Sequence, residues 1–125
     1  MARRVLVADD EPLTAEMLTL MLAFGGFEVV CAHDGREALD LAREVRPDAA
    51  LLDVLMPGLD GDEVARALRE DPELAGCSIV LISSADETEV EWRAAGADLF
   101  LRKPVDIREL PSVVEGLLDR DARAA

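Results

Sequence analysis

Acidic, hydroxyl and lysine side chains recur in this sequence at the ends of short apolar runs. They are Asp9 and Asp10, Asp53, the pair Ser83 and Ser84, and Lys103. Three carboxylates that converge repel each other and resist ionisation, so they favour a divalent cation with oxygen ligands, and Mg²⁺ suits such a site. A lysine and a hydroxyl beside it can neutralise and hydrogen-bond a phosphoryl group, and an aspartate can itself form an acyl phosphate.

The apolar runs predict the strands that would bring these side chains together. Five short runs predict strands over residues 3–8, 27–32, 49–53, 78–83 and 98–102. Cap and stop signals between them predict helices over residues 12–24, 34–45, 60–68, 87–95 and 106–119. Alternation of this kind predicts an α/β fold with a doubly wound parallel sheet, five helices on its two faces and every strand's carboxyl end at one edge.

Two of these helices carry additional signals. In the first, residues Leu13, Met17, Leu20, Met21 and Phe24 follow helical spacing along one face, and we interpret the two methionines as core filler. In the last, Pro111 and Gly116 lie inside the pattern and predict a displaced start or a kink.

Composition restricts the class of protein. The 125 residues predict one domain over 1–125, with its core over about 3–119 and frayed residues at 121–125. The net charge of −14 argues against nucleic-acid or anionic-membrane binding, and no apolar stretch is long enough to span a bilayer. Cys31 and Cys77 fit no disulfide scaffold or zinc pattern, which favours a reducing cytoplasm.

The ordered motifs resemble the receiver domain of bacterial two-component response regulators over Val5 to Leu118. The resemblance rests on Asp9-Asp10, on Leu51-Leu52-Asp53 with Met56-Pro57-Gly58-Leu59-Asp60-Gly61, on Ser84-Ala85, on Ala95-Gly96-Ala97 and on Lys103-Pro104. It implies a flavodoxin-like three-layer sandwich with strand order 2-1-3-4-5. In that order the strands carrying the two cysteines lie too far apart for a disulfide, so both thiols should be free.

The resemblance also implies roles for individual residues. Asp53 would accept a phosphoryl group from the phosphohistidine of a sensor histidine kinase or phosphotransfer protein. Asp10, Asp53 and the backbone carbonyl of Leu55 would bind Mg²⁺, with Asp9 acting through water. Lys103 and Ser84 would contact the phosphoryl oxygens, and Ser84 and Phe100 would form the switch. The Lys103-Pro104 bond would be cis.

A downstream protein would bind the face made by residues 87–95, 98–102 and 106–119, and a homodimer is possible through the same face. Several positions depart from the family pattern. Phe100 replaces the commoner tyrosine, Leu55 offers no side-chain hydrogen bond, Val105 replaces an aromatic residue, and the segment from Ser84 to Gly96 is short.

Structural alternatives exist for single residues: Asp9 and Asp10 can cap a helix, Lys103 can be a solubilising charge, and Ser84 can be a turn residue. Trp92 can belong to the core or to an exposed patch, and the sequence does not separate the two.

Three functions fit the sequence. The leading hypothesis is a stand-alone phosphoacceptor that catalyses its own phosphoryl transfer and slow dephosphorylation and is otherwise no enzyme. It leaves open whether the chain is a natural single-domain protein or part of a longer regulator. The alternatives are a receiver-like scaffold that does not need phosphorylation and a Mg²⁺-dependent aspartyl-phosphate phosphohydrolase. The hydrolase would need a general acid at the position of Leu55.

Overall fold

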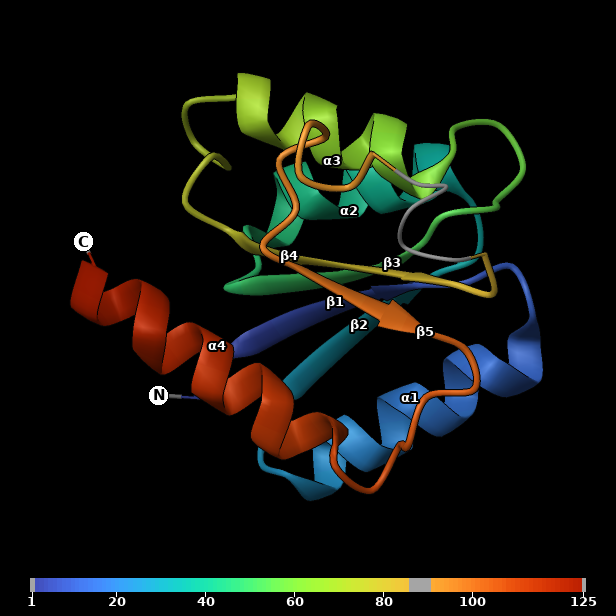
Figure 1. The fold of residues 1–125 in the computed structure, drawn as a ribbon, viewed down its shortest axis with the longest axis vertical. Coiled ribbons are helices and arrows are strands. Elements are labelled where there is room, and N and C mark those ends of the chain that lie inside the picture. The colour runs from blue at the N-terminus through green and yellow to red at the C-terminus, as the bar shows by residue number, and fades with distance from the viewer. Residues whose placement is uncertain (1, 86–90, 125) are drawn as a thin grey trace.

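The fold is a parallel five-stranded sheet between two layers of helices, seen in a computed structural model that describes residues 2–85 and 91–124 (Figure 1). The strands are β1 (Arg4–Ala8), β2 (Glu28–Ala32), β3 (Ala49–Asp53), β4 (Ser78–Ser83) and β5 (Leu99–Arg102). Their order is β2-β1-β3-β4-β5, and every neighbouring pair is parallel. Both the doubly wound fold and the strand order expected from the sequence are confirmed.

Two helices cover each face of the sheet. α1 (Pro12–Phe24) and α4 (Leu110–Ala124) lie on one face, and α2 (Gly35–Val45) and α3 (Gly61–Glu70) lie on the other (Figure 1). Side chains alternate along the strands, so Leu6 and Leu52 pack with α2 and α3 whereas Val7 and Leu51 pack with α1 and α4. β3 and β4 are buried along their whole length, as a parallel sheet covered on both faces requires.

The helices begin where the capping residues predict. The Asp34 side chain accepts a hydrogen bond from Glu37 N at 2.8 Å and starts α2. Asp60 N donates to Glu63 Oε1 at 3.1 Å at the start of α3. A Cβ on Gly61 would collide with the carbonyl oxygen of Asp53, so glycine allows the first residue of α3 to lie against the end of β3.

The interpretation of α1 as a helix with one apolar, buried face is wrong. Its buried residues are Ala15, Leu18 and Leu22, whereas Leu13, Met17, Leu20 and Phe24 are exposed by 70%, 45%, 53% and 86%. Met21 is half-buried. Glu16 is the only charged residue of the helix, so hydrophobic spacing alone could not identify the face that packs on the sheet.

The last helix begins later than its pattern suggests. Residues 107–109 form turns, with Glu109 N donating to Asp106 O at 3.1 Å, and α4 starts at Leu110 with Pro111 as its second residue. A displaced start was one of the two predicted outcomes. The helix can begin here because proline is tolerated in the first turn of a helix. α4 extends to Ala124, beyond the predicted end at residue 119.

The helix predicted over residues 87–95 is wrong where it can be compared. Residues 86–90 lie outside the described part of the chain, and residues 92–96 form turns. Ala97 N donates to Trp92 O at 3.0 Å, and Gly96 has a φ of +92°, which closes the chain back toward the sheet. The described residues therefore contain four helices, without a change in the fold.

Three smaller expectations can be compared directly. The Lys103-Pro104 peptide bond is cis, as expected. Cys31 and Cys77 are both free thiols, also as expected. Within residues 2–85 and 91–124, no helix has the length and apolar character that crossing a membrane requires.

Candidate functional site

The carboxyl ends of three strands bring the predicted acidic residues and the lysine together. Asp9 and Asp10 follow β1, Asp53 ends β3, and Lys103 follows β5. Asp9 and Asp53 are buried, with 1% and 6% of their surfaces exposed, and Asp10 is exposed. One carboxylate oxygen from each of the three aspartates lies within 4.8 Å of the others, close enough to share one cation.

Lys103 bridges the two buried carboxylates. Its Nζ lies 3.1 Å from Asp53 Oδ2 and 3.4 Å from Asp9 Oδ2. Burial alone would lower the pKa of Lys103, but the hydrogen bond and charge of Asp53, with the charge of Asp9, raise it above its ordinary value. The ammonium group is therefore firmly charged at neutral pH.

Asp53 is harder to ionise than an ordinary aspartate, despite this lysine. Burial raises its pKa above the ordinary value and the charge of Asp9 raises it further, against the lowering effect of Lys103 and of the Leu55 backbone N–H. A divalent cation at the three carboxylates would reverse this shift, since it favours their charged forms. The donor set, three aspartate oxygens of which one faces solvent, suits Mg²⁺ with bound waters.

Backbone groups hold the two buried carboxylates in place. Leu55 N lies 3.4 Å from Asp53 Oδ1, and Glu11 N donates to Asp9 Oδ1 at 2.9 Å. The loop after β3 is fixed in turn, because Val54 O accepts from Gly61 N at 2.8 Å. The Leu55 side chain is 64% exposed and lies at the edge of this arrangement.

The remaining predicted site residues lie around this centre. Ser83 is buried at the end of β4, where its Oγ accepts from Ala85 N at 3.1 Å, whereas Ser84 is exposed. Phe100 is half-buried on β5, and its ring packs on Trp92. Trp92 is half-buried and packs against the core on the α2–α3 side, which is the first of the two roles that the sequence left open.

An apolar hollow beside Lys103 was not foreseen from the sequence. It has a volume of about 420 Å³ and lies between α1, the end of β4 and the loop after β5. Its lining consists of Thr14, Leu18, Ile82, Lys103, Pro104, Val105 and Ile107. The small Val105 was the only sequence signal for such a space, because a larger side chain there would occupy more of it.

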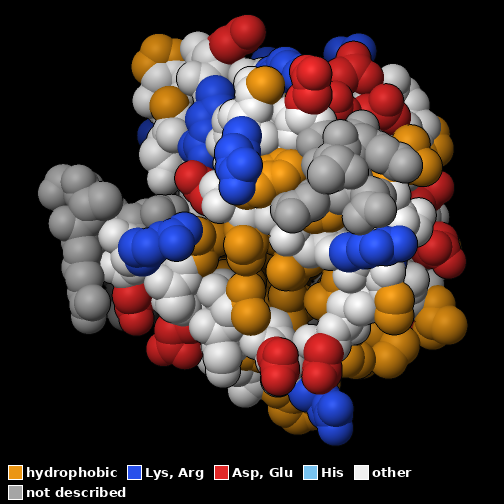
Figure 2. Space-filling view, in the orientation of Figure 1, with side chains coloured by type: hydrophobic (Ala, Val, Ile, Leu, Met, Phe, Trp, Pro, Cys, Tyr) orange, Lys and Arg blue, Asp and Glu red, His pale blue; other side chains and the backbone are white. Residues whose placement is uncertain are grey.

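The exposed apolar residues of α1 were also missed, and they lie on the helix whose Thr14 and Leu18 line this hollow. We call Leu13, Met17, Leu20 and Phe24 the α1 stripe. Figure 2 shows hydrophobic side chains gathered over α1. The signal that could have found it is the near absence of charge in residues 12–24, in a chain of which 32% is Asp, Glu, Lys or Arg.

Comparison with known proteins agrees with this geometry. The model of the response regulator receiver domain family matches residues 5–115. The DNA-binding response regulator MtrA of Mycolicibacterium smegmatis is 41% identical over 123 residues, covering 97% of this chain and 53% of MtrA. The response regulator MprA of Mycolicibacterium vanbaalenii is 43% identical over 117 residues, covering 94% of this chain and 51% of MprA.

A solved CheY-like receiver domain protein from Methanospirillum hungatei superimposes with a TM-score of 0.91 at 25% identity, and the match covers 100% of both chains. The chain spans about half the length of the curated relatives that it matches. The family match extends over nearly the whole fold and includes the strand ends that carry the aspartates and Lys103. This chain belongs to the response regulator receiver domain family.

Proposed function

We propose that Asp53 accepts a phosphoryl group from the phosphohistidine of a sensor histidine kinase or a histidine phosphotransfer protein. One carboxylate oxygen attacks phosphorus, the bond from phosphorus to the histidine nitrogen breaks, and the imidazole takes a proton from solvent. The observation that carries this proposal is the position of Asp53 at the end of β3, buried beside Asp9 with Lys103 Nζ at 3.1 Å.

The surrounding residues have separate roles in this transfer. Asp10 and Asp53, from the group of three aspartates, would hold Mg²⁺ together with the carbonyl oxygen of Leu55, and Asp9 would act through a water. Receiver domains generally bind this ion. When bound, Mg²⁺ neutralises the carboxylates and the oxygens of the transferring group. Lys103 contacts a phosphoryl oxygen, and the Ser84 hydroxyl donates to another. The chain thus catalyses its own phosphorylation and its slow dephosphorylation.

The phosphodonor protein approaches over α1. A protein that delivers phosphorus to Asp53 must cover the surface around it, and this surface includes the hollow beside Lys103. The α1 stripe lies on the helix that lines this hollow, and α1 begins two residues after Asp10. An apolar face of this kind, bordering the acceptor, fits a protein donor better than a free small molecule.

The signal leaves the domain on another face. We assign the output to the face formed by residues 91–97, β5 and α4, which can take a downstream protein or a second copy of the chain. The compartment is the cytoplasm, a proposal that the two free thiols support.

An enzyme that turns over phosphomonoesters is disfavoured by Leu55. Its side chain is apolar and 64% exposed at the place where a general acid would be needed. A scaffold that never becomes phosphorylated is separated from our proposal by direct measurement of the modification.

The experiment is incubation with Mg²⁺ and acetyl phosphate, followed by intact-mass measurement. We expect one phosphoryl group per chain, absent without Mg²⁺ and absent in Asp53→Asn. Asp40→Asn is the matched control, since Asp40 is an exposed aspartate of α2 remote from the three strand ends. Equal modification of wild type and Asp53→Asn, or none in wild type, would contradict the proposal.

A further inference from the structure

The α1 stripe has the spacing of a seam between two helices. Its four residues are separated by four, three and four positions, which is the pattern of the apolar a and d positions of a coiled coil. On a helix with 3.6 residues per turn they lie within an arc of about 60°. The residues that pack on the sheet, Ala15, Leu18 and Leu22, lie on the opposite side of the helix. The stripe therefore has the shape that fits a second helix.

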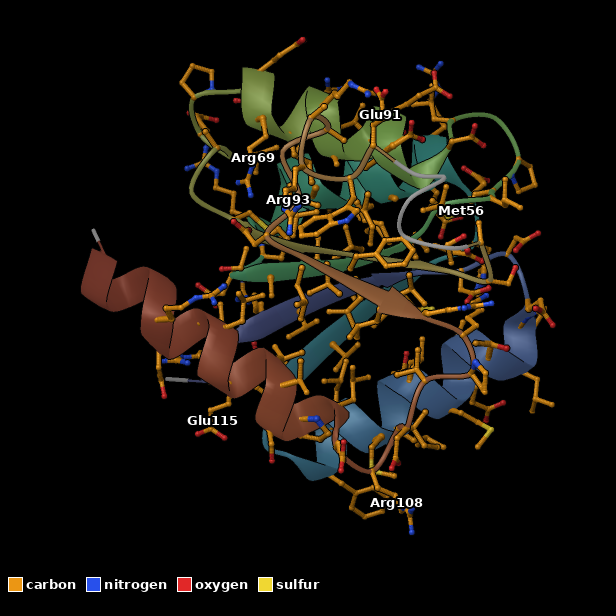
Figure 3. All side chains as sticks on the ribbon, viewed as in Figure 1. Met56, Arg69, Glu91, Arg93, Arg108 and Glu115 are labelled. Carbon is orange, nitrogen blue, oxygen red and sulfur yellow. The ribbon has the colours of Figure 1, made fainter. Side chains whose placement is uncertain are left out.

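The apolar hollow lies beside the N-terminal half of the same helix. Thr14 and Leu18 of α1 line it together with apolar residues of the loop between β5 and α4. Figure 3 shows this loop running along α1, with Arg108 pointing away from the protein, and the Arg108 side chain is 83% exposed. A cavity of roughly 150 Å³ already holds a benzene ring, so a hollow of about 420 Å³ has room for an aromatic side chain.

Phe24 is the most exposed residue of the stripe, and it cannot enter the hollow of its own chain. Its side chain is 86% exposed at the C-terminal end of α1. Thr14 lies ten residues earlier on the same helix, which is roughly 15 Å along the helix axis. The chain thus carries an exposed aromatic side chain and an apolar hollow that only another molecule can bring together.

A second copy in antiparallel orientation brings them together twice. When Met17 of one copy lies opposite Leu20 of the other, Phe24 lies opposite Leu13, one residue before Thr14. Each Phe24 is then level with the hollow of the other copy. The arrangement has two-fold symmetry and is closed, because both copies use the same surface and neither leaves a site open for a third.

Charge also favours the antiparallel orientation. Glu16 is the only charged residue of α1, but Asp10 and Glu11 directly precede the helix and the chain carries a net charge of −14. A parallel pair would place the acidic ends of both helices side by side. An antiparallel pair separates them by the length of 13 residues, roughly 20 Å, which is about twice the screening length at 0.1 M salt.

We propose that two copies of the chain associate through antiparallel α1 helices, with Phe24 of each copy filling the hollow beside Lys103 of the other. This surface is separate from the output face assigned above. One short helix and one hollow per copy form a small interface, so we expect a dissociation constant of roughly 10–100 µM. The phosphodonor uses the same helix, so paired copies must separate before transfer. Only this last consequence rests on the proposed function.

The experiment is analytical ultracentrifugation of the unphosphorylated chain between roughly 5 and 500 µM, a range that spans the expected dissociation constant. Wild type should pass from monomer to dimer. Phe24→Ser should weaken association roughly ten-fold or more, and so should Val105→Phe, which fills the hollow from within the chain. The control is Leu55→Ser, because it removes a side chain 64% exposed outside the stripe and the hollow and should leave association unchanged.

Mixing the two weakened variants tests the contact itself. Phe24→Ser keeps an intact hollow and Val105→Phe keeps an intact Phe24, so a mixed pair regains one of the two contacts. The mixture should therefore associate more strongly than either variant alone. A wild type that stays monomeric, a Phe24→Ser that dimerises like wild type, or a mixture no more associated than its components would overturn the inference. These outcomes do not depend on phosphorylation, so they are independent of whether Asp53 is the acceptor.

Discussion

Replacing Lys103 with methionine should destabilise the fold in a way that Mg²⁺ reverses. Methionine keeps the apolar stem of the side chain and removes the only ammonium group that lies between Asp9 and Asp53. These two carboxylates are 1% and 6% exposed, so they would remain buried together without a counter-charge. The backbone N–H groups of Leu55 and Glu11 that contact these carboxylates are neutral, and Asp10 adds a third carboxylate oxygen within 4.8 Å.

The magnitude follows from the geometry. Removing one partner of a buried ion pair costs about 3–5 kcal/mol. The Lys103 side chain is 24% exposed and its two contacts are 3.1 and 3.4 Å long, so water weakens the pair. We therefore expect a loss of about 2 kcal/mol in the free energy of unfolding, or roughly 7 °C in Tm for a domain of this size.

The assay is urea unfolding of wild type and Lys103→Met at pH 7, without Mg²⁺ and with a saturating concentration of it. Bound Mg²⁺ neutralises the same carboxylates, so it should stabilise the variant more than wild type and reduce the difference between them. Arg108→Met is the control, because Arg108 pairs with Asp106 on the exposed surface. Equal stability of wild type and Lys103→Met without the ion, or an equal shift of both with it, would refute the electrostatic account of the site.

Three further outcomes are expected from other residues. Without Mg²⁺, Asp53→Asn should be more stable than wild type at pH 7, because the folded pKa of Asp53 is raised above its ordinary value of 3.8 and wild type loses stability as the pH rises through the folded pKa. Melting curves should show the difference in stability shrinking toward pH 4, and a difference that does not change with pH would exclude this cause. Arg69→Met should lower the free energy of unfolding in urea by roughly 3 kcal/mol, since the guanidinium group of Arg69 donates to Gly96 O, Ala75 O, Cys77 O and Asp98. The control Arg66→Met removes only an exposed pair with Asp62 and should cost about 0.5 kcal/mol. Phe24→Ser replaces a side chain that is 86% exposed, so it should leave stability and modification by acetyl phosphate unchanged. It should slow phosphoryl transfer from a histidine kinase about five-fold, which is the effect of losing roughly 1 kcal/mol at an interface. Equal slowing with both donors would argue against docking on α1.

The strands and the acidic site could be predicted because their signals are local. Each strand is a short apolar run, and each chemical residue stands at the end of one, so the parallel arrangement alone brings Asp9, Asp10, Asp53 and Lys103 to one edge. The pairing of Lys103 with Asp9 as well as Asp53 was not foreseen. It depends on the depth at which Asp9 is buried, and residue spacing does not encode depth.

The connection between β4 and β5 was predicted poorly for a different reason. Residues 91–95 carry helix-compatible side chains, yet the structure closes them into turns. The deciding contacts are long-range, since Arg69 lies 27 residues before Gly96 and 29 before Asp98. Helix propensity depends on neighbouring residues and does not include the hydrogen bonds that Arg69 of α3 donates to this segment. Here these tertiary contacts override the local propensity.

The α1 stripe could not be identified from the hydrophobic pattern of the sequence. In a helix with one apolar face, the hydrophobic pattern identifies the face that packs on the core. α1 is apolar nearly all round, a pattern that normally indicates complete burial. The sheet needs only the face of Ala15, Leu18 and Leu22, so the second apolar face serves no purpose in this fold. Its position beside the hollow next to Lys103 provides that purpose if a protein donor covers both while it reaches Asp53. On this reasoning the α1 stripe, which does not pack in the core, selects the partner protein. The aspartates at the strand ends supply the chemistry.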